Sequence, residues 1–211
     1  MTKKLEQLVK VLPPKRPLTT LSAIVEDWQY RFGPGAPYNK MRDHVTDYCL
    51  KASSVDEAVV RACDSRSEEG KTHNHQSKVP RAIRTEFGKG IIKVWRAKLH
   101  SARSLQPVVT NFDALYDLVN SARIWGIGNV TEYDVATRIA AYLKLEVQSL
   151  YLHAGVLQAW KILKGSYRYP RRIPRAWLPR EFISLPTDEI EDMLCTYRDC
   201  WPKAGHWEET E

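Results

Sequence analysis

The chain has 211 residues, of which 43% are hydrophobic, so it can bury a core as one large domain or two smaller ones without disulfide staples. Its formal charge of +7 favours an acidic partner, nucleic acid before others. The four cysteines form no CxxC pair, and no apolar stretch approaches the length of a membrane span, which argues against a disulfide-rich secreted scaffold and a membrane protein. The N-terminal residues hold only a broken apolar run, so we expect no signal peptide, no membrane partner and a cytoplasmic location.

The first hundred residues show a helical period almost throughout. Ile24 and Trp28 fall on one face of a predicted helix, and the turn GPGAP at 33–37 ends that helix. Ser54 has the position of a helix N-cap, with Glu57 completing a capping box. The pattern predicts helices over residues 18–32, 38–50, 54–64 and 80–99.

A polar, aperiodic segment, SRSEEGKTHNHQSK, spans residues 65–78. We expect it to form a long, exposed and mobile loop between two helices. Pro80 suits the first turn of the helix that follows, while Gly88 and Gly90 are expected to break or bend that helix.

From residue 112 the helical period sharpens, and it predicts helices over 112–124, 131–143, 153–164 and 188–199. Between the last two lies a proline-punctuated basic connector, SYRYPRRIPRAWLPREF. We find no alternating strand of useful length and no internal repeat, so the sequence predicts an all-α helical bundle. A soft boundary around 101–111 separates an N-terminal helical part, 1–104, from a C-terminal part, 105–211, and one continuous helical domain is an equal alternative.

The most specific motif is RIWGIGNVTEYDVATRIAAYL, residues 123–143, in which a glycine turn joins two predicted helices. Gly126 and Gly128 allow positive φ and the close approach of another backbone. The N–H groups at the start of the second helix, together with its dipole, form a site for an anion. Thr131 has the position of a cap for that helix or of a hydroxyl contact to a phosphate.

Residues 112–143 resemble the helix-hairpin-helix motif of DNA repair and recombination proteins, in which apolar–Gly–apolar–Gly is followed three positions later by threonine or serine. The resemblance implies contacts to DNA phosphates that do not read sequence, made by Gly126, Ile127, Gly128, Asn129 and Thr131. Val130 replaces the lysine or arginine that the family often has, and Glu132 places a carboxylate where alanine is usual. The alternative is a helical corner whose glycines serve close packing. The stretch through LYLHAGV also resembles phrases in uncharacterised bacterial proteins, which implies no function.

The sequence assigns no catalytic residue and no cofactor. In DNA glycosylases the same motif is followed by a catalytic aspartate, but here Glu146 is the only carboxylate near that position, so base excision is not expected. Tyr133 and Asp134 have positions from which a water could be polarised, yet both residues are also ordinary near a helix start. We find no serine–histidine–acid set, phosphate loop or dinucleotide fingerprint.

Two histidines in the polar segment, His73 and His75, raise the question of a metal site. They could ligate an ion with Asp64 or Cys63 as a distant third ligand. We favour the interpretation that they are exposed loop histidines and that no metal is bound.

The basic connector is the second candidate for DNA contact. Its arginines alternate with tyrosines and a tryptophan, a composition typical of surfaces that follow a nucleic-acid backbone. The arginines assigned to this contact are Arg168, Arg171, Arg172 and Arg175. The alternative is that the prolines hold the segment against the protein while the arginines stay solvated.

Three hypotheses follow from the sequence. The first is a DNA-binding protein that holds double-stranded DNA, tolerant of sequence, through the glycine turn and the connector. The second is a metal-dependent enzyme that processes nucleic acid with His73 and His75. The third is a protein–protein interaction module that binds no nucleic acid.

Overall fold

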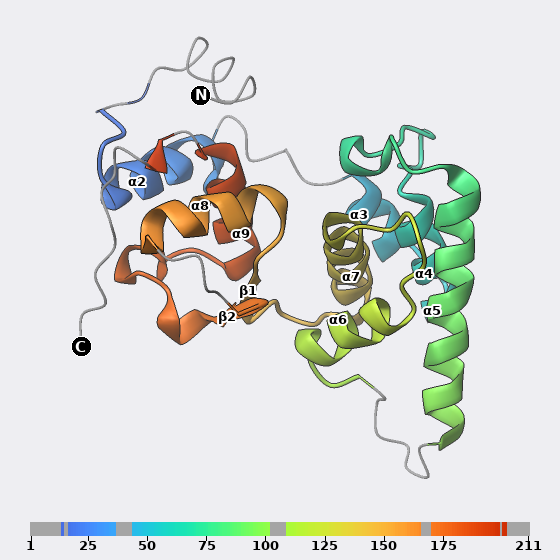
Figure 1. Cartoon of the computed structure of the whole chain (residues 1–211). Helices are drawn as coiled ribbons and strands as arrows, with labels where there is room; N and C mark the ends of the chain where they lie inside the picture. The colour runs from blue at the N-terminus through green and yellow to red at the C-terminus, as the bar shows by residue number, and fades with distance from the viewer. Residues whose placement is uncertain are drawn as a thin grey trace. The chain divides into compact units, whose positions relative to one another are not determined.

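The computed structural model of this chain describes residues 14, 17–36, 44–101, 109–165, 170–198 and 200–201, without the side chains of 74 and 98–101. The chain forms two compact units, of which the first joins Met1–Met41 to Gln148–Glu211 and the second is Arg42–Val147. Both units are built mostly from helices, which confirms the predicted all-α fold (Figure 1). Among the described residues, no helix combines the length and the apolar character that crossing a bilayer requires.

The structure divides the chain differently from the boundary indicated by the sequence. The segment 101–111 lies inside the second unit, and the helices on its two sides pack against each other. The first unit is assembled from both ends of the chain, while the second is inserted between them. The composition change at 101–111 marks only a connection between helices that share one core.

The second unit contains α3 (His44–Leu50), α4 (Val55–Asp64), the 3-10 turn η1 (Asn74–Gln76), α5 (Arg81–Ser101), α6 (Phe112–Ser121) and α7 (Asn129–Leu143). Helix α7 contacts α3, α4 and α6, while α4 also packs on α5 (Figure 1). The side chains buried on α7 include Val135, Ala136, Ile139 and Ala140, which recur at helical spacing. Helix α7 therefore positions residues at the centre of this unit.

Helix α5 is continuous through Gly88 and Gly90, so these glycines do not break it. A Cβ atom added to Gly88 would lie 3.3 Å from Cys63 Cβ on α4. One added to Gly90 would lie 3.4 Å from the Ala122 carbonyl oxygen, directly after α6. The two glycines allow α5 to approach its neighbours closely, which is a packing role that local propensity does not reveal.

Side-chain caps start three of the helices that the structure describes. Ser54 Oγ accepts from the Glu57 amide at 3.2 Å, and Asn111 Oδ1 accepts from the Ala114 amide at 2.9 Å. The expected capping box is displaced by one residue, because the Glu57 carboxylate accepts from the Ser53 amide instead. In the first unit, Thr20 caps the helix α2 (Leu21–Phe32).

The first unit contains α2 (Leu21–Phe32), β1 (Ser149–Tyr151), α8 (Ala154–Lys164), β2 (Arg172–Pro174), the 3-10 turns η2 (Arg175–Trp177) and η3 (Arg180–Phe182), and α9 (Thr187–Thr196). Strands β1 and β2 pair antiparallel, with Leu150 opposite Ile173. The basic connector is therefore partly a strand and two 3-10 turns, an arrangement that the sequence did not indicate.

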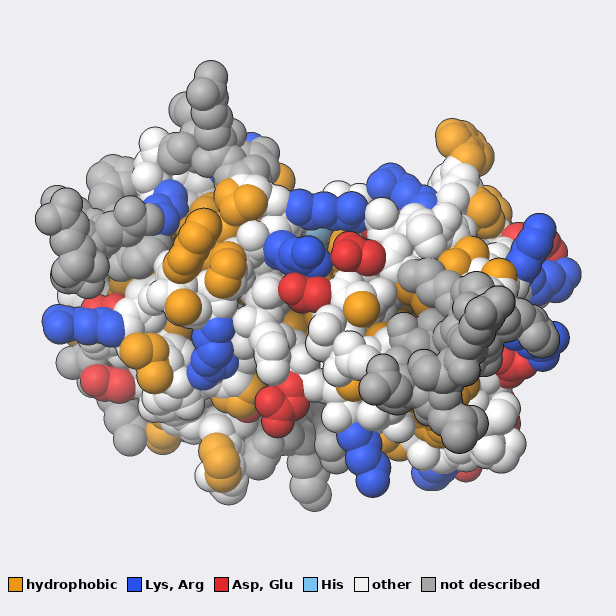
Figure 2. Space-filling model, turned by 90° about the horizontal axis from the view of Figure 1, so that it is seen from below, with side chains coloured by type: hydrophobic (Ala, Val, Ile, Leu, Met, Phe, Trp, Pro, Cys, Tyr) orange, Lys and Arg blue, Asp and Glu red, His pale blue; other side chains and the backbone are white. Residues whose placement is uncertain are grey.

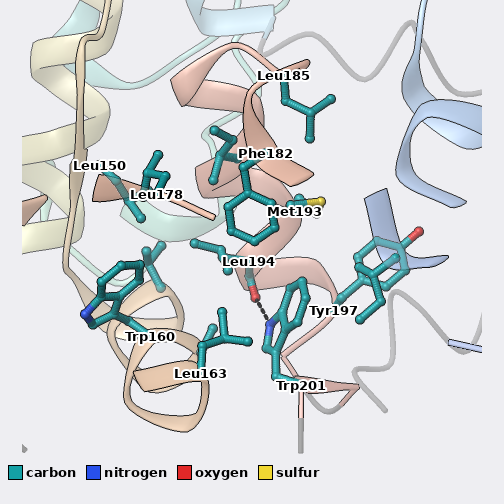
Figure 3. Packing of buried hydrophobic residues seen from close by; sticks show 14 of the residues in the cluster. Leu150, Trp160, Leu163, Leu178, Phe182, Leu185, Met193, Leu194, Tyr197 and Trp201 are labelled. Carbon is teal, nitrogen blue, oxygen red and sulfur yellow. Dashed lines mark hydrogen bonds between the residues drawn. The ribbon is translucent and has the colours of Figure 1, made fainter. Parts of the chain in front are cut away.

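The hydrophobic core of the first unit is rich in large side chains (Figure 3). Trp160 and Leu163 come from α8, and Phe182 from η3. Trp201 is fully buried, and its indole N–H donates to the Leu194 carbonyl at 3.0 Å. Large aromatic residues with satisfied polar atoms give this small unit much of its buried area.

Candidate functional site

The turn between α6 and α7 contains two glycines with different roles. Gly126 has φ of +90°, a conformation that favours glycine. A Cβ atom at Gly126 would also lie 3.2 Å from Ile83 Cδ1 on α5. The turn conformation and the packing against α5 therefore both explain Gly126.

Gly128 has neither reason to be glycine. Its φ is −98°, which any residue adopts, so the expectation of positive φ at this position was wrong. A Cβ atom there would meet none of the described atoms within 4 Å. Gly128 is exposed and is the N-cap residue of α7. Because glycine has no side chain, no capping side chain accepts hydrogen bonds from the first amides of the helix.

The carboxylate of Glu132 does not face solvent beside these amides. It is fully buried, and one of its oxygens lies 3.1 Å from Arg123 Nε. Arg123 also donates to the Ile127 carbonyl and to Asn129 Oδ1, so its guanidinium spans the turn. The positive charge of Arg123 therefore compensates the carboxylate that, in the sequence, argued against an anion site.

Three of the predicted contact residues play other parts in the turn. The Ile127 side chain is buried, and its amide donates to the Ile124 carbonyl. Thr131 is 5% exposed and lies inside α7, so it is not the helix cap. Asn129, at the start of α7, is exposed but accepts from Arg123. Gly128 and Asn129, at the start of α7, are both exposed residues.

Trp125, at the tip of the turn, was missed by the sequence interpretation. Its side chain is 93% exposed, the largest exposure among the large hydrophobic residues described. An exposed indole is suited to contact a partner with a flat apolar surface.

The connector arginines do not form one set. Arg175 donates to Thr187 Oγ1 at 3.0 Å and to the carbonyls of Ile183 and Leu185, so its guanidinium holds the connector to the start of α9. Arg171 is exposed and Arg172 is half-buried. Arg168 lies outside the described residues.

The segment 65–78 is more structured than the exposed loop expected from its composition. Arg66 and Thr72 form an isolated antiparallel bridge, and η1 follows. Ser65 and Gln76 are fully buried although their neighbours are mostly exposed. The expectation of a wholly exposed segment was wrong because both buried residues make polar contacts inside the second unit.

His73 and His75 converge on Asp134 of α7. One ligand atom from each of the three side chains lies within 4.8 Å of the others. His75 Nδ1 lies 3.0 Å and His73 Nδ1 3.8 Å from Asp134 Oδ2. The proposed third ligands are elsewhere, because the Asp64 carboxylate pairs with Arg81 and Cys63 is buried, which raises the pKa of its thiol.

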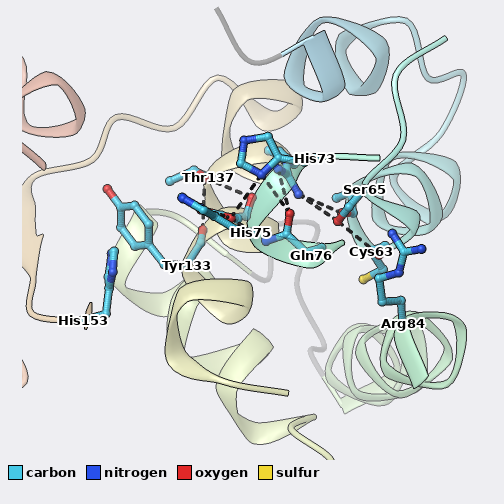
Figure 4. A network of polar contacts seen from close by, with 12 residues as sticks. Cys63, Ser65, His73, His75, Gln76, Arg84, Tyr133, Thr137 and His153 are labelled. Carbon is cyan, nitrogen blue, oxygen red and sulfur yellow. Dashed lines mark hydrogen bonds and ion pairs between the residues drawn. The ribbon is translucent and has the colours of Figure 1, made fainter. Parts of the chain in front are cut away.

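Gln76 and Arg138 hold this group in place (Figure 4). Arg138 can only donate, so the Gln76 oxygen faces it at 3.3 Å and the Gln76 amide nitrogen donates to Asp134. The same Gln76 oxygen lies 3.1 Å from His73 Nδ1, which must therefore carry the proton.

The Asp134 carboxylate is held in its charged form. Burial by itself raises its pKa, but the hydrogen bond from His75 and the positive charge of Arg138 outweigh burial and lower the pKa below its usual value. An ionised carboxylate beside two imidazoles can accept hydrogen bonds or ligate a cation.

Comparisons with models of known protein families, with curated proteins and with solved structures find no match for this chain. Its function is therefore argued from the two sites of the second unit, the glycine turn and the histidine cluster.

Sequence reasoning named both histidines and the glycine turn but not the residues that complete them. In the sequence, Asp134 is either a residue that could polarise a water or an ordinary helix-start residue, and no motif points to Gln76, Arg138 or Arg123. The spacing of Asp134 and Arg138, four residues apart on one helix, is a local signal that their side chains share a face. Asp134 and His75, however, are separated by 59 residues, and no local pattern pairs them.

Proposed function

We propose that this chain binds double-stranded DNA with little regard to its sequence and holds a backbone phosphate at the start of α7. The observation that carries the proposal is Gly128, an exposed glycine that neither its backbone angle nor its packing requires. A residue without a side chain at this point lets a phosphate oxygen reach the first amides of the helix. Contacts of this kind position DNA without reading bases.

The electrostatics of the turn support the proposal. Helix α7 has 15 residues, so its N-terminal amides carry the partial positive charge of a full helix dipole. The nearby Glu132 is buried and compensated by Arg123, whose side chain is 47% exposed. A phosphate at the turn thus approaches an amide group and a guanidinium before it approaches a carboxylate.

Figure 2 shows the charged side chains on one face of the chain. On the face drawn in Figure 2, lysine and arginine side chains alternate with acidic and hydrophobic ones and do not gather in one patch. The exposed Arg171, in the first unit, and the half-buried Arg172 are proposed as additional contacts. A cytoplasmic location, where DNA is accessible in bacteria, belongs to the same proposal.

The decisive experiment replaces Gly128 by aspartate. Aspartate is a favourable N-cap, so Gly128→Asp should leave the thermal stability unchanged or slightly higher. Its carboxylate should accept hydrogen bonds from the first amides of α7 and repel phosphate, so binding to a short DNA duplex should weaken at least about tenfold. The salt slope, which is the slope of log affinity against log salt concentration, should fall in magnitude by about one.

The matched control is Ser54→Asp, which adds the same charge at the exposed N-cap of α4 in the same unit. This control should bind the duplex like the parent protein, as measured by fluorescence anisotropy over a series of salt concentrations. If Gly128→Asp binds as tightly as Ser54→Asp, the turn is not the DNA site. If the parent protein does not bind the duplex at low salt, DNA binding is rejected and a protein-interaction module becomes the better interpretation.

A further inference from the structure

We propose that His73, His75 and Asp134 bind one divalent transition-metal ion of the zinc class. Two imidazole nitrogens and one carboxylate oxygen are the donor set that proteins use for zinc and its neighbours in the first transition row. Calcium and magnesium, in contrast, prefer sites made of oxygen atoms alone. This inference does not depend on DNA binding, because it rests on a different group of residues.

The distances between the donors are close to those that a metal requires. Ligands at about 2.0–2.1 Å from a tetrahedral zinc ion lie about 3.3 Å from one another. His75 Nδ1 and Asp134 Oδ2 are 3.0 Å apart, and all three donors fall within 4.8 Å. The His75 side chain is 55% exposed, so its ring can adjust without disturbing the core.

The surroundings of the donors prepare them for a cation. Gln76 Oε1 lies 3.1 Å from His73 Nδ1 and fixes the orientation of the His73 ring. The Asp134 carboxylate is held by Gln76, whose own orientation is set by Arg138. His75 now donates its Nδ1 proton to Asp134, and when both groups hold an ion that proton moves to Nε2 of the ring. Such hydrogen bonds around ligands orient them and increase metal affinity.

The number of protein ligands indicates an ion with coordination positions left for water or another exchangeable ligand. Structural zinc sites are closed by four protein ligands, whereas three protein ligands leave room for water or substrate. Among the described residues, no fourth histidine, cysteine or acidic side chain joins the group. The exposure of His75 places the remaining positions of the ion toward solvent.

A purely structural role explains the group less well. The two hydrogen bonds of Gln76, to Asp134 and from Arg138, already connect η1 to α7. Arg138 adds contacts to Ser65 Oγ at 3.0 Å and to the Ala62 carbonyl at 3.3 Å. The exposed ring of His75 is not needed for this connection, yet it lies against the same carboxylate oxygen.

The test measures zinc binding by the full chain after treatment with a chelator. Isothermal titration with zinc chloride should show one site, and magnesium chloride at the same concentration should show none. His75→Gln and Asp134→Asn should each weaken zinc binding at least about tenfold. The matched control is His44→Gln, an exposed histidine of α3, which should leave zinc affinity unchanged.

A second readout uses cobalt(II), which reports the donors directly. Cobalt bound to the parent protein and to His44→Gln should show the visible absorption of a site with nitrogen ligands, and His75→Gln should lose it. Circular dichroism should show that the apo forms of all variants are equally folded. The inference is rejected if the parent protein binds no zinc at micromolar concentration, or if His75→Gln and Asp134→Asn bind it as tightly as His44→Gln.

The same measurement on Gly128→Asp distinguishes this inference from the DNA proposal. Gly128 lies at the N-terminus of α7 and contributes no ligand, so Gly128→Asp should keep the zinc affinity of the parent protein. Loss of DNA binding with intact zinc binding in this variant would support the two proposals separately.

Discussion

At the scale of single residues, the first unit contains a charged network in its core. Arg31 binds both oxygens of Asp27, at 2.6 and 3.1 Å, and the Tyr197 hydroxyl donates to the same carboxylate at 2.6 Å. All three side chains are buried. A buried charge is tolerated only when it is paired and hydrogen-bonded, and here each partner satisfies the other.

This network predicts a loss of stability at alkaline pH. Burial, together with Asp27, raises the pKa of Tyr197 above its ordinary value. The folded state therefore keeps a proton that the unfolded chain releases above about pH 10, so the free energy of unfolding should fall as the pH rises past that value. Thermal melts between about pH 8 and about pH 11 measure this dependence.

The variant Tyr197→Phe provides the comparison for the alkaline prediction. It should be less stable at neutral pH by about 1–3 kcal/mol, because Asp27 loses a donor. Above about pH 10 its melting temperature should fall less steeply than that of the parent protein. Equal slopes in the two proteins would mean that Tyr197 does not cause the alkaline loss.

At the scale of elements, the connector combines structural and exposed arginines. Arg175 makes three hydrogen bonds that hold η2 near the start of α9. Arg171, in contrast, is exposed just before β2, where Arg172 is half-buried. The two roles were indistinguishable in the sequence because all three residues lie within five positions of one another.

Replacing Arg171 and Arg172 by alanine tests the proposed second DNA contact. Each phosphate contact releases counterions, so the double variant should bind the duplex more weakly at all sequences and lower the salt slope by about two. Binding should be measured beside Arg175→Ala, whose main effect is expected on stability. A double variant that remains folded and keeps the affinity and salt slope of the parent protein would remove the connector from the DNA site.

The positions of the helices were accessible from sequence because their determinants are local. The apolar period and the Ser54 cap predicted a helix over 54–64, and α4 is Val55–Asp64. Helix α7 was predicted over 131–143 and begins two residues earlier, at Asn129, because Gly128 caps it in place of Thr131. Helix ends depend on a few capping contacts and are therefore less certain than helix interiors.

At the scale of the whole molecule, the two units differ in how the chain builds them. The second unit, Arg42–Val147, is one continuous segment with its own buried residues, among them Phe87, Ile91, Leu115 and Ile139. The first unit needs segments from both ends of the chain. Because the second unit is one continuous segment, the entropy lost on closing long loops is smaller for it than for the first unit. We therefore expect the second unit to fold more readily.

This difference predicts that residues 42–147 fold when produced alone. The fragment should show a helical circular dichroism spectrum and a cooperative thermal transition, because the packing of α4 with α3, α5 and α7 is internal to it. A mixture of 1–41 and 148–211 as separate chains should show much less structure. A fragment 42–147 without a cooperative transition would mean that its core depends on the rest of the chain.

The sequence by itself determined the helical class of this protein, the approximate extent of its helices and the two motifs worth testing, because apolar period, caps and glycine turns act over a few neighbouring residues. Only the tertiary structure decided that Gly126 packs on Ile83 while Gly128 has an open position, and that His73 and His75 meet Asp134. These outcomes depend on side chains far apart in the chain, whose proximity is set by the packing of α4, α5 and α7. No short-range pattern encodes such proximity, and so it had to come from the fold.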